Sequence, residues 1–180
     1  MRRFNAVLTV FILALFLVHA IAGGFQLLGL GQTALKAIGW TCLALIAVHA
    51  CIGVKLTVDS LRVWRKTGAG YFRENRMFWL RRISGFAVLA FLILHLLAFH
   101  STGAGGGYRL PRFTAGRLAA QILLILSIGV HGFSNMRPSM LSLGAVGWRR
   151  WMADLLLVLS VLLLFMGAAF VIYYLRWNVW

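Results

Sequence analysis

Acidic residues are nearly absent from this chain of 180 residues, which contains only three, Asp59, Glu74 and Asp154. None of the three lies in the middle of a long apolar stretch. Membrane proteins that carry cations, or that relay protons through carboxylates, place ionisable groups along the path through the bilayer. The shortage of acids therefore argues against both functions.

Cysteine is equally scarce. Cys42 and Cys51 lie nine residues apart in one apolar stretch, which puts them about 13 Å apart along a helix and on opposite faces. At that separation they cannot form a disulfide with each other. The motif Cys-x-x-Cys-His, which attaches haem covalently, does not occur. We expect both cysteines to be small apolar fillers.

Apolar sequence dominates instead, since 62% of the residues are hydrophobic and the mean hydropathy is +0.89. A membrane-spanning helix needs about 20 mainly apolar residues. Five stretches meet that length: 4–28, 34–58, 78–100, 118–136 and 152–175. We predict an all-α integral membrane bundle of five transmembrane helices, forming a single domain over residues 1–180. The first stretch resembles a secretory signal, but its apolar run continues to Leu28, so we expect it to be retained.

The net charge of +15 would suggest nucleic acid in a soluble protein, but here the basic residues lie at the ends of the apolar stretches. If the N-terminus is cytoplasmic, 13 of the 18 basic residues fall on the cytoplasmic side. The positive-inside rule favours that orientation. We therefore predict a multi-pass protein of the cell inner (cytoplasmic) membrane, with lipid and no nucleic acid as a partner.

Two connections stand out by composition. The segment 59–77 is the most polar part of the chain, and its basic residues could bind lipid headgroups or dock a cytoplasmic subunit. The other, STGAGGGYRLP, is rich in glycine. It lacks the strand and helix of a phosphate-binding unit, so we interpret it as a flexible loop.

Histidine is the main functional signal. Each of the first four apolar stretches holds one histidine well inside it, His19, His49, His95 and His131. Counting at about 1.5 Å per residue from the cytoplasmic edge places His19 and His95 about 20 Å deep. The same count places His49 and His131 about 9 Å deep. The sequence therefore predicts two pairs at two levels, His19 with His95 and His49 with His131.

Paired imidazoles from different helices are what a b-type haem with two axial histidines needs, one ring nitrogen of each binding iron. Two alternatives stay open at this point. The histidines could simply form hydrogen bonds between helices, or they could bind a divalent metal. Small residues near the proposed ligands give weak support to a flat ring between helices: Ala20, Gly23, Ala50, Gly53, Gly85, Gly129 and Gly132.

Three segments, HACIGVKL from His49, RRISGFAVLAFLILH ending at His95, and HGFSNMRP from His131, carry a resemblance. With the number of spans and the placement of the histidines, they resemble the di-haem cytochrome b anchor of succinate:quinone and quinol:fumarate oxidoreductases. That family has five transmembrane helices and pairs axial histidines of the first span with the third and of the second with the fourth. The depth count gives the same pairing independently.

The resemblance implies a membrane anchor and electron-transfer subunit with two b haems, the outer held by His19 and His95 and the inner by His49 and His131. It implies a cytoplasmic FAD-containing flavoprotein and an iron-sulfur subunit as partners. A membrane quinone, menaquinone or ubiquinone, would be the substrate. The chain would not catalyse the dicarboxylate reaction but would house quinone reduction or quinol oxidation, and the complex could form a higher oligomer.

Further residues are expected near the haems. Arg81, Arg82 and Ser84 stand near the inner edge where haem propionates need donors, and Lys55 and Arg137 could help. For the outer haem the candidates for propionate or quinone contacts are Gln26, Tyr108 and Arg109, and His100 is read as interfacial or close to a quinone headgroup.

Two positions depart from the family pattern. Some members carry a glutamate where this chain has Gly129, and Asn135 replaces a common glycine. The missing acid leaves the proton acceptor of the quinone site unidentified. A di-haem cytochrome b of another membrane dehydrogenase or reductase is the second hypothesis, and a metal-binding or transport protein is the third.

Overall fold

The computed structural model describes residues 1–30, 36–67, 76–99, 113–144 and 147–178. These residues form five helices: α1 (Arg2–Leu27), α2 (Lys36–Thr67), α4 (Arg76–Phe99), α5 (Ala115–Leu143) and α6 (Trp148–Asn178). All five are long and apolar enough to cross a membrane. A helix satisfies its backbone hydrogen bonds internally, which hydrocarbon requires because it offers no partner. The prediction of an all-helical, multi-pass membrane bundle is confirmed.

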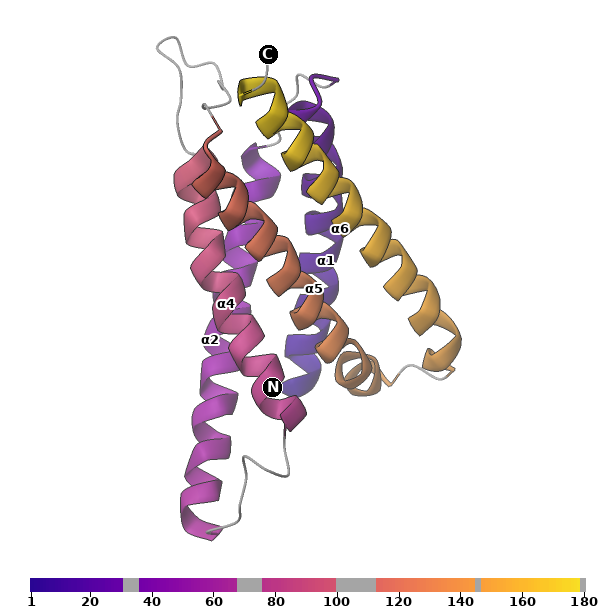
Figure 1. Ribbon diagram of the computed structural model, residues 1–180. Coiled ribbons are helices and arrows are strands. Elements are labelled where there is room, and N and C mark those ends of the chain that lie inside the picture. Colours follow the sequence, from indigo (N-terminus) through magenta and orange to yellow (C-terminus); the bar gives the residue numbers. More distant parts are fainter. Residues whose placement is uncertain (31–35, 68–75, 100–112, 145–146, 179–180) are drawn as a thin grey trace.

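The helices pack in two pairs that α6 supports from one side (Figure 1). Helix α4 runs along α5, and α1 runs along α2. Helix α6 packs against α5 and α1, whereas α2 and α4 meet over a short stretch only. The N- and C-termini lie at opposite ends of the bundle.

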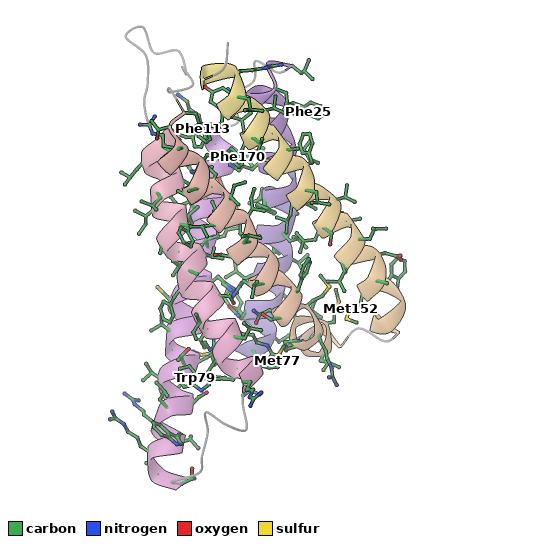
Figure 2. All side chains as sticks on the ribbon, in the orientation of Figure 1. Phe25, Met77, Trp79, Phe113, Met152 and Phe170 are labelled. Atoms are coloured by element: carbon green, nitrogen blue, oxygen red, sulfur yellow. The ribbon has the colours of Figure 1, made fainter. Side chains whose placement is uncertain are left out.

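The tightest packing lies at the end of the bundle that holds the C-terminus, where Figure 2 labels Phe113 and Phe170. These two rings stack with their centres 6.0 Å apart and their planes 7° from parallel. They belong to a buried cluster that joins the ends of α1, α5 and α6: Leu27, Phe113, Ala169, Phe170 and Tyr173. This cluster holds α6 against α1 and α5. The four histidines lie on the other four helices.

Helix α2 is longer than the sequence predicts. The apolar stretch ends near Val58, and the sequence predicts a connection over 59–77, but α2 continues to Thr67. A helix can continue through polar residues where it is surrounded by water. Arg65 and Lys66 in its last turn also interact favourably with the helix dipole. Its 32 residues span about 48 Å, well beyond the roughly 30 Å of a hydrocarbon core. Figure 1 shows this end of α2 projecting past its neighbours.

Helix α5 also continues further than expected. The predicted span ends at Met136, shortly before Pro138, because proline disrupts a helix interior. In the structure α5 includes Pro138 and ends at Leu143, and Gly144 adopts the left-handed conformation, with φ of 71°, that closes the helix. The remaining helices are likewise a few residues longer at one or both ends than the apolar stretches.

Candidate functional site

The four histidines of the first four spans meet as two pairs across the bundle. The imidazole centres of His19 on α1 and His95 on α4 lie 6.2 Å apart, with their planes at 79°. Those of His49 on α2 and His131 on α5 lie 6.3 Å apart, at 89°. These are the two pairs that the depth count predicts. Each pair joins a helix of the α1–α2 unit to a helix of the α4–α5 unit.

The distance between ring centres separates two uses of such a pair. A hydrogen bond of about 2.9 Å between two imidazole nitrogens would bring the ring centres to about 5 Å. A metal ion bound between them, with metal–nitrogen bonds of about 2 Å, would put the centres about 6 Å apart. Both distances exceed the hydrogen-bonded value and leave room for a metal between the rings, so direct hydrogen bonding does not account for the pairing.

His95 is held by a residue of the neighbouring helix. Its Nδ1–H donates to Oε1 of Gln121 on α5 at 2.7 Å. Gln121 is fully buried, and its Nε2 has no hydrogen-bond partner. A buried donor without a partner costs about 1–3 kcal/mol. With the proton on Nδ1, the Nε2 of His95 is left with a lone pair that can bind a metal.

His131 is held in the same way by the opposite helix. Its Nδ1 lies 3.2 Å from the hydroxyl of Ser84 on α4, which itself donates to the carbonyl of Arg81 at 3.2 Å. The hydroxyl is thus free to accept from Nδ1–H, which would leave the lone pair on Nε2, while the amide nitrogen of Asn135 also lies 3.4 Å from Nδ1. Gly85 makes room for the ring, since a Cβ there would lie 3.0 Å from Cε1 of His131. The Nδ2 of Asn135 donates a hydrogen bond to the backbone carbonyl of His131 at 2.8 Å.

The two histidines of the α1–α2 unit, His19 and His49, have different surroundings from those of His95 and His131. A Cβ on Gly39 of α2 would lie 3.5 Å from both Nδ1 and Cε1 of His19, so that edge of the ring faces the backbone of α2. The Nδ1 of His49 is buried and has no hydrogen-bond partner. One histidine of each pair is thus held by a side chain of the α4–α5 unit, whereas His19 lies against the backbone of α2 and His49 has an unpaired ring nitrogen.

Space remains next to both of these histidines. Gly23 and Gly53 lie one helical turn beyond His19 and His49, on the same face of their helices. A Cβ on Gly23 would meet nothing within 4 Å, and one on Gly53 would meet a terminal nitrogen of Arg82 at 3.8 Å. The position beside His19 is therefore open, and the position beside His49 is bordered by the Arg82 side chain. This arrangement fits a flat ring placed between the α1–α2 and α4–α5 units.

Arg81 has a structural partner in α5. Proline at position 138 has no N–H, so the carbonyl of Ser134 loses its usual helical hydrogen bond. The Nε of Arg81 donates to that carbonyl at 2.8 Å. The sequence predicts Arg81 as a donor to a haem propionate, which stays a prediction; its Nε joins α4 to α5 one turn from His131. This bond explains how α5 continues through a proline.

The other predicted residues differ in their placement. Arg82 reaches from α4 toward α2, beside Gly53, and its guanidinium carbon lies 5.0 Å from the centre of the Phe78 ring. It therefore stands beside the inner histidine pair. Arg137 and Lys55 are exposed, and Gln26 is half-buried. Tyr108, Arg109 and His100 lie outside the described residues.

Gln121 and Gly39 are not among the predicted site residues. A depth count could have found Gln121, because it lies ten residues before His131 on α5, about 15 Å further out and close to the level of His95. The glycines that follow the first two histidines were also visible as a repeated spacing, in HAIAG and HACIG. Gly39 gives no such signal, because its role depends on how α2 crosses α1.

The hydrogen bond from Arg81 to the Ser134 carbonyl generates a test. Arg81→Met should lower the free energy of unfolding by about 1–3 kcal/mol, because it leaves a buried carbonyl unpaired. Pro138→Ala supplies an N–H for the same carbonyl, so Arg81→Met should cost less than half as much in that background. Unfolding by titration with sodium dodecyl sulfate measures both costs.

Arg76→Met is the matched control, because Arg76 is exposed at the start of the same helix. It should change the unfolding free energy by less than about 0.5 kcal/mol. If Arg81→Met costs the same with and without the Pro138→Ala substitution, the carbonyl of Ser134 is not what Arg81 stabilises.

Comparisons of the chain with protein-family models, with curated proteins and with solved structures find no match. Function is therefore inferred from this chain's own residues. The main elements are the two histidine pairs, the side chains that hold His95 and His131, and the glycines beside His19 and His49.

Proposed function

We propose that this chain is the membrane anchor and electron-transfer subunit of a complex of the succinate dehydrogenase or fumarate reductase type. It would hold two b haems, the outer between His19 and His95 and the inner between His49 and His131. The observation that carries the proposal is the pair of ring-centre distances, 6.2 and 6.3 Å, between histidines of opposite helical units.

The number of ligands supports haem over a bare metal ion. Among the described residues no three histidine, cysteine or acidic side chains come together in a group that could hold a metal ion. A bare divalent ion bound by two imidazoles would lack most of its ligands. A haem would need only two ligands from the protein, His19 with His95 or His49 with His131, because the macrocycle would supply the rest. The open face beside Gly23 would accommodate its plane.

Individual residues of the chain would have separate roles in holding the two haems. Bound haem supplies one-electron chemistry at each level. The Nδ1–H groups of His95 and His131 would donate to Gln121 and Ser84, which would leave Nε2 of each histidine to hold the iron. Arg82, beside the inner pair, is the best-placed cation for an inner propionate. Electrons would pass between the two levels, about 11 Å apart in depth, and a membrane quinone.

The partners follow from charge and orientation. We place the N-terminus and the projecting end of α2 in the cytoplasm, on the basis of the distribution of basic residues. An iron-sulfur subunit and a flavoprotein carrying FAD would dock on that basic face. A di-haem subunit of another membrane dehydrogenase would use the same histidines. Co-purified subunits separate the two assignments, since a flavoprotein with succinate or fumarate activity indicates the first and a molybdenum or nickel enzyme the second.

Haem content tests the proposal directly. The purified complex should show a b-type spectrum and two haems per chain in a pyridine haemochrome assay. His95→Ala and His131→Ala should each remove one haem, and the component that is lost should differ between the two. His100→Ala, which changes the remaining histidine, should keep both. A wild-type complex without haem would end the proposal.

The open face of α1 supplies a steric test. Gly23→Leu should remove the outer haem and keep the inner one, because the new side chain would occupy the space beside His19. Gly167→Leu is the matched control, because a Cβ at Gly167 of α6 also meets nothing within 4 Å. It lies about 22 Å along α6 from Met152, close to the depth counted for His19. If both variants keep two haems, the ring does not lie beside Gly23.

Orientation has its own measurement. Five spans put the two termini on opposite sides, and we expect the N-terminus to be cytoplasmic. Alkaline phosphatase, which is active only outside the cytoplasm, should therefore be active when fused after Trp180 and inactive when fused after Thr67. The reverse pattern would place the basic face and its docking partners on the outer side, and would contradict the proposed assembly.

A further inference from the structure

Gln121 is the most deeply buried polar side chain of the described residues, with an exposed fraction of 0%. It lies on α5 and its Oε1 accepts a hydrogen bond of 2.7 Å from Nδ1 of His95 on α4. Its own Nε2 has no partner. Methionine would fill a similar volume without leaving a buried donor unpaired, so packing does not explain an amide at this position. The contact with His95 is what distinguishes glutamine from an apolar residue here.

We propose that Gln121 is a positioning residue that lowers the reduction potential of the outer haem, an inference that rests on the proposed function. A carbonyl that accepts from Nδ1–H draws the proton away from the ring, which makes Nε2 a stronger donor to iron. Stronger donation stabilises the ferric more than the ferrous state, and hydrogen bonding around an axial ligand is one of the means by which a protein sets a haem potential.

The structure also provides an internal comparison. His131 on α5 contacts Ser84 on α4 at 3.2 Å, so each level has one histidine held by the facing helix of the α4–α5 unit. Gln121 is joined to the outer pair and Ser84 to the inner pair. A change at either residue should therefore act on one haem and leave the other nearly unchanged, whereas a general disturbance of α4–α5 packing would act on both.

Redox titration of the purified complex measures the effect. Dithionite supplies one electron to each iron, His95 keeps its Nδ1 proton in both oxidation states, and the b-type absorbance reports the reduced fraction. The outer component is the one that His95→Ala removes. Gln121→Met should raise the ratio of ferrous to ferric outer haem at a fixed potential about tenfold, equivalent to about 59 mV for a one-electron couple. Ser84→Ala should shift the inner component instead.

Gln121→Glu separates electronic from steric effects. Its carboxyl oxygen still accepts from Nδ1–H, so the outer potential should stay at the wild-type value or fall below it. The inference is supported if the outer reduction potential rises in Gln121→Met and is unchanged or lower in Gln121→Glu. If Gln121→Met does not assemble, Gln121→Glu decides alone: an outer potential at or below wild type supports the inference, and one above wild type overturns it.

Failure of this inference differs from failure of the proposed function. A wild-type complex without b-type haem overturns the proposed function itself. Two haems in the wild type, with a Gln121→Met variant whose outer potential is unchanged or whose two components move equally, overturn only the role of Gln121.

Discussion

The lack of hydrogen-bonding solvent in hydrocarbon is the constraint on which this structure depends. A buried polar side chain can then be satisfied only by another part of the protein or by a bound group. The four histidines are the strongest case, because each carries a ring N–H in the membrane. Two of them find a hydrogen-bond partner across the α4–α5 interface: His95 pairs with Gln121, and His131 pairs with Ser84. The same bonds that satisfy the N–H groups fix which nitrogen of each ring is available to a ligand.

This constraint divides the bundle into two unequal halves. The α4–α5 unit is joined by the hydrogen bonds of His95 and His131 and by the bond from Arg81 to the Ser134 carbonyl. In the α1–α2 unit, His19 faces the backbone at Gly39, and His49 has a buried nitrogen without a partner. The first unit holds its histidines through side-chain hydrogen bonds, whereas the histidines of the second unit have no such bond among the described contacts. A cofactor inserted between them would complete contacts that the α1–α2 unit lacks.

The sequence predicts much of this architecture, because hydropathy and depth are properties of single helices. Apolar length locates all five helices, and counting residues from the basic edges identifies which histidines meet. What it misses depends on contacts between helices or on water. Helix α2 continues past Val58 because polar residues suit a helix in water, which hydropathy does not register. Helix α5 passes Pro138 because Arg81, far away in sequence, serves the carbonyl of Ser134. Gln121 is missed because its role depends on its hydrogen bond with His95 of α4.

The projecting end of α2 has a consequence for any protein that binds there. Helix α2 runs without interruption from the level of His49 to Thr67, a distance of about 27 Å. Among its described residues only Cys42 and Thr57 are buried, so neighbouring helices restrain it lightly. Beyond His49 it is one uninterrupted helix, and its end projects past the neighbouring helices. A protein bound to that end would therefore contact the same continuous helix that carries His49.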